Sequence, residues 1–289
     1  LDTGAYPEPV RHLLGEMTAA AVLMQSNIKF NGALVMQIFG DGPLKLAVVE
    51  VQPDLSVRAT AKVVGDLDGA QTLSTMVNVK NEGRCAITLD PLNKLPGQQP
   101  YQGVVPLFDD HRNKIDKFSE VLQHYMLQSE QLDTTLVLAA DDKSAAGLLI
   151  QRLPIKGEGN LAAKASMADE DEIGRNEDYN RISILAASLK SEELLQLDAD
   201  TILRRLFWEE KLIRLETLAP SFSCSCSRDR VSNMIRSLGA DEVESILSER
   251  NDVEVGCDFC GQQYRFDAVD AAQIFTSADK QVPGSSAIQ

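Results

Sequence analysis

Two periodicities of apolar residues alternate along the first half of the chain. Between positions 10 and 28 they recur at intervals of three and four, which predicts an amphipathic helix that follows Pro9 and ends at the Asn31-Gly32 turn. Short apolar runs separated by turns rich in glycine and proline then predict strands. These strands are expected at about 34–39, 44–51, 55–64, 84–89 and 101–107.

A second helix and a closing hairpin complete this pattern. The helix is expected from Ile115 to about Ser129, and the hairpin strands at 134–140 and 147–153. The first three strands follow one another closely enough to form an antiparallel meander. Residues 1–154 are therefore predicted to form an α+β core domain, with a mostly antiparallel sheet and long helices.

Residues 155–223 differ from the preceding part of the chain in composition and pattern. They open with loop residues and an acidic run at 168–172, which is typical of a solvated segment. Helical patterns follow at 179–189, 191–197 and 201–210, the last beginning near a possible Asp200 cap. The last helix has a stripe formed by Ile202, Leu203, Leu206 and Phe207. We predict a helical, metastable linker that must dock on a core, because its apolar surface is too small to fold alone. The stripe is either such a docking face or a surface for partners.

Composition narrows the classes of function. The 289 residues have a net charge of −15 and a pI near 4.7, which argues against nucleic acid and against an anionic membrane surface. No apolar run approaches the ~20 residues of a membrane span. The chain starts with Leu1, so we expect a trimmed piece of a longer protein. Cysteine spacing and the lack of a recognisable targeting segment favour the cytoplasm.

Four of the five cysteines form two tight pairs about 30 residues apart. Cys224 and Cys226 form a CxC motif, and Cys257 and Cys260 form a CxxC motif followed by Gly261. Four converging thiolates are a typical tetrahedral zinc site, with one polar helical segment expected between the pairs. We predict that residues 224–289 form a zinc-binding domain with one ion bound in the reduced state. A disulfide scaffold and a thioredoxin-type dithiol fit less well, since neither a secretory signal nor a parallel βα pattern accompanies the pairs.

The remaining candidate residues give no catalytic arrangement. Cys85 lies in an apolar strand and is expected to be a buried apolar cysteine. His12, His111 and His124 have no partner at metal-binding spacing, and no pair of carboxylates stands out. We therefore expect a protein that is not an enzyme.

Short motifs along nearly the whole chain resemble those of the heat shock protein 33 family of redox-regulated chaperones. They are Gly40-Asp41-Gly42-Pro43-Leu44, Tyr101-Gln102-Gly103-Val104-Val105, Gln128-Ser129-Glu130-Gln131-Leu132, Glu192-Glu193-Leu194-Leu195, and the cysteine stretch with Ser227-Arg228. The order of an α+β domain, a charged helical connection and a CxC…CxxCG stretch matches as well. Family members have a further segment ahead of the position of Leu1.

The resemblance implies an ATP-independent holdase that binds unfolding client proteins. In the family, four thiolates hold zinc while the protein is reduced and inactive, and peroxide with heat or hypochlorous acid oxidises them. The implied disulfides are Cys224–Cys226 and Cys257–Cys260, although cysteine counting alone allows three pairings. Zinc then leaves, the C-terminal domain and linker unfold, and apolar surface is exposed. The active form is expected to be a homodimer.

The sequence supports such a switch on physical grounds. The C-terminal segment is small and polar with few aromatic residues, so a metal rather than a hydrophobic core is expected to keep it folded, contributing on the order of 10 kcal/mol. Zinc also closes a loop of about 30 residues, a constraint of ~3.5 kcal/mol, whereas disulfides between near neighbours close only small rings. The alternatives are a constitutive protein-interaction module with a purely structural zinc and a dithiol oxidoreductase. A nucleic-acid-binding zinc ribbon is disfavoured by charge.

Overall fold

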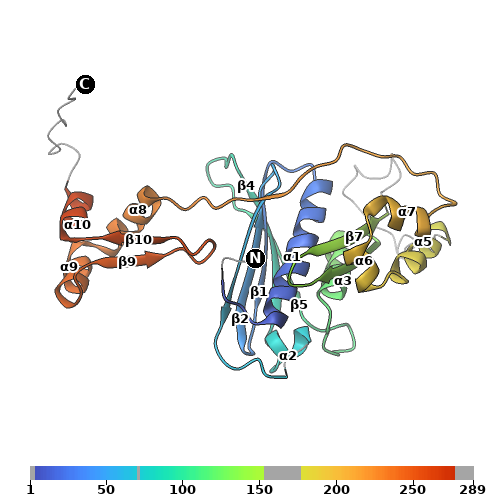
Figure 1. Cartoon of the computed structure of the whole chain (residues 1–289), viewed down its shortest axis with the longest axis horizontal. Helices are drawn as coiled ribbons and strands as arrows, with labels where there is room; N and C mark the ends of the chain where they lie inside the picture. Colours follow the sequence, from blue (N-terminus) through green and yellow to red (C-terminus); the bar gives the residue numbers. More distant parts are fainter. Residues whose placement is uncertain (1–3, 70–71, 153–176, 277–289) are drawn as a thin grey trace. The chain divides into compact units, whose positions relative to one another are not determined.

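A computed structural model describes residues 4–69, 72–152 and 177–276, which belong to two compact units (Figure 1). The larger unit is Leu1–Ser223 and the smaller is Cys224–Gln289. The predicted boundary after Pro154 and the acidic run at 168–172 lie outside the described residues.

The larger unit is built on a six-stranded sheet. Its strands are β1 (Gly32–Phe39), β2 (Leu44–Val51), β3 (Ser56–Val63), β4 (Arg84–Pro91), β5 (Tyr101–Pro106) and β8 (Ser221–Phe222). They lie in the order β5-β4-β1-β2-β3-β8, and all neighbours are antiparallel except β3 and β8. The predicted meander is confirmed for β1 to β3. The fourth strand instead returns to the other side of β1, so the whole sheet is not one meander.

One face of this sheet carries the core of the larger unit. Cys85 pairs with Ile38, which pairs with Ala47, and all three side chains are fully buried. Burial raises the pKa of the Cys85 thiol to about 12, so this cysteine stays protonated near neutral pH. The prediction of a buried apolar Cys85 is confirmed.

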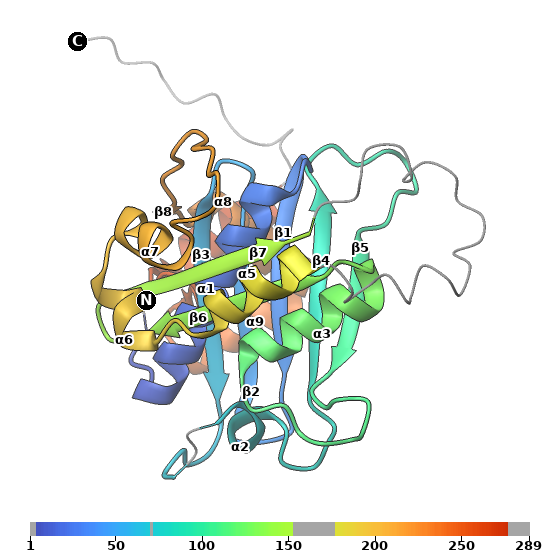
Figure 2. The same cartoon turned by 90° about the vertical axis from the view of Figure 1, so that its right-hand side faces the viewer.

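Helix α1 (Glu8–Asn27) lies between the sheet and a hairpin formed by β6 (Thr134–Ala140) and β7 (Ala145–Gln151) (Figure 2). It contacts β1, β2 and β3 on one side and β6 and β7 on the other, which explains its many fully buried residues. Helix α3 (Phe118–Glu130) packs against β6, and the short α2 (Leu73–Val77) lies near β2. Ile115 precedes α3 instead of starting it, because a bridge between Phe108 and Lys114 keeps the chain extended there. The predicted α+β class is confirmed.

Three helices dock on the outer hairpin of the larger unit. They are α5 (Glu177–Ala187), α6 (Ser191–Gln196) and α7 (Ala199–Leu206). A small apolar cluster joins α6, α7 and the turn before α6 to the hairpin through Ala139, Leu189, Leu194 and Ile202. The stripe on α7 is therefore a docking face, as one of the two interpretations predicted.

Helix α7 differs in its bounds from the prediction. Asp198, and not Asp200, caps its start by accepting a hydrogen bond from the Thr201 N–H at 2.9 Å. It ends at Leu206 instead of Glu210, since Phe207 leaves the helical conformation at φ −128° and buries its ring. No helix among the described residues combines the length and apolar character needed to cross a bilayer.

The segment between α7 and β8 has no regular structure and exposes many large apolar side chains. They are Trp208, Leu212, Ile213, Leu215, Leu218 and, on β8, Phe222. Monomeric proteins rarely expose so many large apolar residues in one stretch, and such surfaces commonly bind other proteins. We refer to residues 208–222 as the apolar segment.

The smaller unit corrects two expectations. Its elements are α8 (Arg228–Leu238), α9 (Ala240–Glu249), β9 (Val253–Gly256), β10 (Gln263–Phe266) and α10 (Ala268–Phe275). The expected single helical segment is two helices, because Gly239 adopts φ +96° between them. The expected lack of a hydrophobic core is wrong, since apolar side chains from all five elements form one: Ile235, Val243, Val253, Phe266, Ala271 and Ile274.

Asp41, in the turn between β1 and β2, holds a distant loop of the larger unit. Its carboxylate accepts hydrogen bonds from the N–H groups of Val79, Lys80 and Glu82 at 2.6, 2.8 and 2.9 Å. Hydrogen bonds to a charged acceptor are stronger than neutral ones, and their loss leaves three donors without this acceptor.

We predict that Asp41→Ala lowers the free energy of unfolding of the larger unit by about 2–4 kcal/mol, measured by urea denaturation. Asp66→Ala is the matched control, because that exposed carboxylate accepts only the Asp68 N–H among the bonds described for it, at 2.8 Å. It is expected to cost less than ~1 kcal/mol. Equal losses in the two variants would contradict this role of Asp41.

Candidate metal centre

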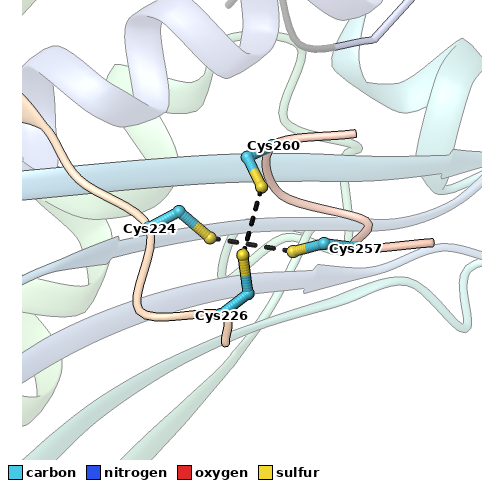
Figure 3. Close-up of side chains that lie close together, drawn as sticks. All are labelled: Cys224, Cys226, Cys257 and Cys260. Atoms are coloured by element: carbon cyan, nitrogen blue, oxygen red, sulfur yellow. Dashed lines mark hydrogen bonds between the residues drawn. The ribbon is translucent and has the colours of Figure 1, made fainter. Parts of the chain in front are cut away.

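The four C-terminal cysteines converge on one point. Their sulfur atoms all lie within 4.8 Å of one another. Two of the separations run between the two pairs, at 3.3 Å for Cys226 and Cys260 and 3.7 Å for Cys224 and Cys257 (Figure 3). All four side chains point inward, and none of the four is in a disulfide.

This arrangement fits a tetrahedral metal ion. With metal–sulfur bonds of ~2.3 Å, the edges of a tetrahedron are about 3.8 Å long, close to the separations between the pairs. Among the residues that the structure describes, no other group of three or more metal-binding side chains comes close enough to hold an ion. His12 and His124 lie 3.8 Å from the carboxylates of Asp142 and Asp110, respectively.

The second cysteine pair lies in the turn of the β9–β10 hairpin. The Cys257 N–H donates to the Gln262 carbonyl at 2.9 Å, and the Gly261 N–H donates to the Cys257 carbonyl at 2.8 Å. Gly261 adopts φ +73°, a conformation that favours glycine. The chain therefore reverses tightly, which brings Cys257 and Cys260 to the same side.

The first cysteine pair lies just before α8 and is fixed by the start of that helix. Ser227 caps α8 by accepting a hydrogen bond from the Arg230 N–H at 3.2 Å. Arg228 donates to the Arg265 carbonyl at 2.9 Å and to the Asp270 carboxylate at 2.7 Å, and its guanidinium lies 4.2 Å from the centre of the Phe266 ring. Arg228 thus connects the CxC segment to β10, α10 and the small core.

Tyr264 is a neighbour of the cluster that the sequence analysis missed. Its hydroxyl donates to the Cys226 sulfur at 3.2 Å, and this bond is the main reason why the pKa of Tyr264 rises to about 12. The sequence does contain a signal for Tyr264. It lies two residues before the core residue Phe266, and residues two apart on a strand share a face, so Tyr264 points inward as well. A hydroxyl donor beside a sulfur ligand stabilises the thiolate form and orients it.

The Cys260 thiol favours the neutral form while no cation is bound. Desolvation, together with hydrogen bonds to the other three cysteines, raises the pKa of Cys260 to about 12. Four thiolates this close would repel one another strongly. A divalent cation reverses that balance, so metal binding to this cluster releases protons near neutral pH.

We predict that Tyr264→Phe weakens zinc binding by the reduced protein by about 10-fold, because it removes one hydrogen bond to a ligand sulfur. Competition with a zinc-chelating dye measures the effect. Tyr101→Phe is the matched control, since its hydroxyl donates to Glu130 in the larger unit at 3.2 Å. Equal zinc affinities in Tyr264→Phe and the control would show that the Tyr264 contact does not support the ligand.

Known proteins match this chain over most of its length. The family model described as "Hsp33 protein" matches residues 1–267. The "33 kDa chaperonin" of Chromobacterium violaceum is 47% identical over 271 residues, covering 94% of this chain and 83% of that protein. That of Methylobacillus flagellatus is 43% identical over 273 residues, covering 94% and 84%, respectively. A crystal structure of the 33 kDa chaperonin (heat shock protein 33 homolog) from Thermotoga maritima shares the fold, with a TM-score of 0.71 and 20% identity over 94% of this chain and 87% of that one. The predicted resemblance is confirmed, and the chain belongs to the Hsp33 family.

Proposed function

We propose that this protein is an ATP-independent holdase chaperone for unfolding client proteins, inactive while its four C-terminal cysteines are reduced and hold zinc. Membership of the Hsp33 family and the name 33 kDa chaperonin, carried by relatives at up to 47% identity, support a chaperone. The observation that carries the switch is the convergence of four free cysteines within 4.8 Å.

Zinc is the metal proposed for this site, held by Cys224, Cys226, Cys257 and Cys260. An all-sulfur donor set of four at tetrahedral spacing suits zinc best among common cellular metals. When bound, the ion keeps the four sulfurs deprotonated. It also ties together two segments that are distant in sequence, since Cys224 and Cys257 are 33 residues apart.

Oxidation of the cysteines removes the charges that hold a cation. In each pair two thiolates lose two electrons as a sulfur–sulfur bond forms. A hydroperoxide accepts those electrons as its oxygen–oxygen bond breaks, and protons from solvent complete the water that is produced. Two disulfides therefore consume two peroxide molecules. Disulfide sulfur is a poor metal ligand, so the oxidised site no longer binds zinc.

The proposed disulfides are the local ones, Cys224–Cys226 and Cys257–Cys260. They close small rings and separate the two segments, whereas bonds between Cys224 and Cys257 or Cys226 and Cys260 would keep the unit stapled. With the tie removed, the hydrophobic interactions that oppose unfolding come from a small core of six buried side chains and the partly buried residues packed on it. We propose that the smaller unit then unfolds and that the linker of residues 155–223 loosens with it, leaving residues 1–154 as the stable core domain.

Client proteins are proposed to bind apolar surface near the linker. The apolar segment and the face of β6–β7 beneath α6 and α7 are the candidates, and the acidic character of the chain, net −15, keeps such an exposed state soluble. We propose that the active form is a homodimer and that the protein is located in the cytoplasm. We also propose that it is not an enzyme and that it binds neither nucleic acid nor membranes.

A constitutive interaction module with a purely structural zinc is the second candidate. The observation that favours it is the apolar segment, because Trp208 and Leu215 are already 74% and 82% exposed while all four cysteines are thiols. In that case client binding would not depend on the redox state.

We predict that reduced, zinc-loaded protein does not suppress the thermal aggregation of a cysteine-free test protein, measured by light scattering, whereas peroxide-treated protein does. Cys85→Ala is the matched control and should switch like the unchanged protein, because Cys85 is buried away from solvent. Equal suppression in both redox states would support the constitutive module and contradict the switch.

We further predict that peroxide releases one zinc ion per chain and yields the two local disulfides, detected with a chelating dye and by mass spectrometry of peptides. Limited proteolysis should then cleave within residues 224–276 at a rate at least 10-fold higher than in the reduced protein, since local unfolding exposes the backbone. Disulfides between the two pairs, or an oxidised unit as resistant as the reduced one, would contradict the proposed unfolding.

A further inference from the structure

Helix α5 has little apolar contact with the rest of the larger unit. It lies along β6 (Figure 2). Among the residues described in α5, only Ala186 is buried, and Ile184 is largely exposed. The turn before α6 and the helices α6 and α7, by contrast, contribute Leu189, Leu194 and Ile202 to the apolar cluster on the same hairpin. Contacts of another kind must therefore keep α5 docked.

Three hydroxyl groups connect α5 to the core, one from β6 and two from α5. The Thr135 hydroxyl donates to the Ser183 hydroxyl at 2.9 Å and lies 3.0 Å from the Tyr179 hydroxyl. A threonine hydroxyl has a single hydrogen, so the Tyr179 hydroxyl is the donor to Thr135 while Thr135 donates to Ser183. The bonds form a directed chain in which each one polarises the next. We refer to Tyr179, Thr135 and Ser183 as the hydroxyl chain.

The place of the hydroxyl chain follows from the periodicities of the two elements. Tyr179 and Ser183 are four residues apart, so they lie on one face of α5. On β6, Leu136 is buried in the main core, which puts Thr135 and Ala139 on the opposite face, and Ala139 belongs there to the apolar cluster beneath α6 and α7. One face of β6 thus holds the linker by hydrogen bonds near its start and by apolar contacts near its end.

The apolar segment is also restrained through α5. Arg181, on α5, forms an ion pair with Glu210, which lies in the apolar segment. The arginine is exposed, so the pair contributes little free energy by itself. Its geometry nevertheless requires α5 to be in place. Loss of α5 from β6 would therefore remove one restraint on the apolar segment as well.

We propose that Thr135, the central member of the hydroxyl chain, is the positioning residue that holds α5 on β6 in the reduced protein and sets how readily the linker is released after oxidation. Hydrogen bonds are directional, so they fix α5 in one register and are lost together when the helix shifts. Each bond is weak by itself, which keeps the release reversible. This inference rests on the proposed function, because release matters only if the linker covers client-binding surface.

Hydrogen exchange of the reduced, zinc-loaded protein tests the hold on α5. Thr135→Val keeps the β-branched shape but removes the hydroxyl, so the amides of residues 181–187 should exchange about 10-fold faster. Thr134→Val is the matched control on the same strand, because the Thr134 hydroxyl donates to the Leu132 carbonyl at 3.1 Å and accepts from the Gln151 amide at 3.2 Å. It should leave exchange in α5 unchanged.

Further variants separate the hydrogen bonds from a general loss of stability. Thr135→Ser keeps a hydroxyl and should exchange like the unchanged protein. Ser183→Ala should speed exchange in α5 about fivefold in the unchanged protein but not in Thr135→Val, where the donor is already missing. If Thr135→Val does not fold, Ser183→Ala is compared with Ser188→Ala, since the Ser188 hydroxyl donates locally to the Leu185 carbonyl at 2.6 Å.

The effect on linker release is measured in the full-length protein after peroxide treatment. The probe is carboxymethylated α-lactalbumin, a permanently unfolded protein without free thiols, and its binding is followed by fluorescence anisotropy as the temperature is raised. Thr135→Val should begin to bind the probe about 5 °C below the unchanged protein, because fewer bonds oppose the release of the linker. Thr134→Val should begin to bind at the temperature of the unchanged protein.

Failure of this inference and failure of the proposed function give different results. If the oxidised, unchanged protein never binds the probe while α5 exchanges as expected, the proposed function fails and the hydroxyl chain still positions α5. If α5 exchanges equally fast in Thr135→Val and Thr134→Val, or if Thr135→Ser exchanges as fast as Thr135→Val, the hydroxyl chain does not hold α5 and the inference is wrong. Faster exchange in Thr135→Val with an unchanged binding temperature would overturn the role of Thr135 in linker release.

Discussion

The approach of four sulfur atoms to within 4.8 Å is the constraint on which the smaller unit depends. Neutral thiols can sit this close, and desolvation raises the pKa of the Cys260 thiol and so favours its neutral form. Four thiolates can do so only around a cation. The charge state of these sulfurs is thus coupled to whether two segments of the unit, the CxC and the CxxC segments, stay together.

The two units respond differently to the loss of that tie. The larger unit has an extensive core formed by one face of a sheet, α1, α3 and the β6–β7 hairpin, none of which involves the cysteine cluster. The smaller unit has six buried apolar side chains, and Arg228 links its CxC segment to Phe266 within that core. Small domains with cores of this size commonly need a metal or disulfides to remain folded. A chemical change at sulfur therefore acts first on the smaller unit.

The features that could be predicted well from the sequence are those encoded by local patterns. Strands such as β2 follow from a continuous apolar run between turns, and the convergence of the four C-terminal cysteines follows from their spacing. Long-range strand pairing was not predictable, because no local sequence signal indicates that β4 pairs with β1. The small core escaped detection since its residues are spread thinly through polar helices, as Ile235 and Val243 are. The Tyr264 contact with Cys226 depends on a register between β10 and the CxC segment that only the folded unit provides.

The pairing of the short strand β8 with β3 is weak by itself and depends on the rest of the chain. Its two backbone bonds contribute ~1 kcal/mol each, whereas ordering each residue costs about 1–2 kcal/mol, so β8 would not stay paired as an isolated segment. Its conformational freedom is restricted from one side, because the next residues enter the folded smaller unit at Cys224. When that restriction is removed, the entropic cost of pairing rises while the two bonds stay the same. The pairing of β8 with β3 therefore depends more on what restrains the chain after Ser223 than on the two bonds themselves.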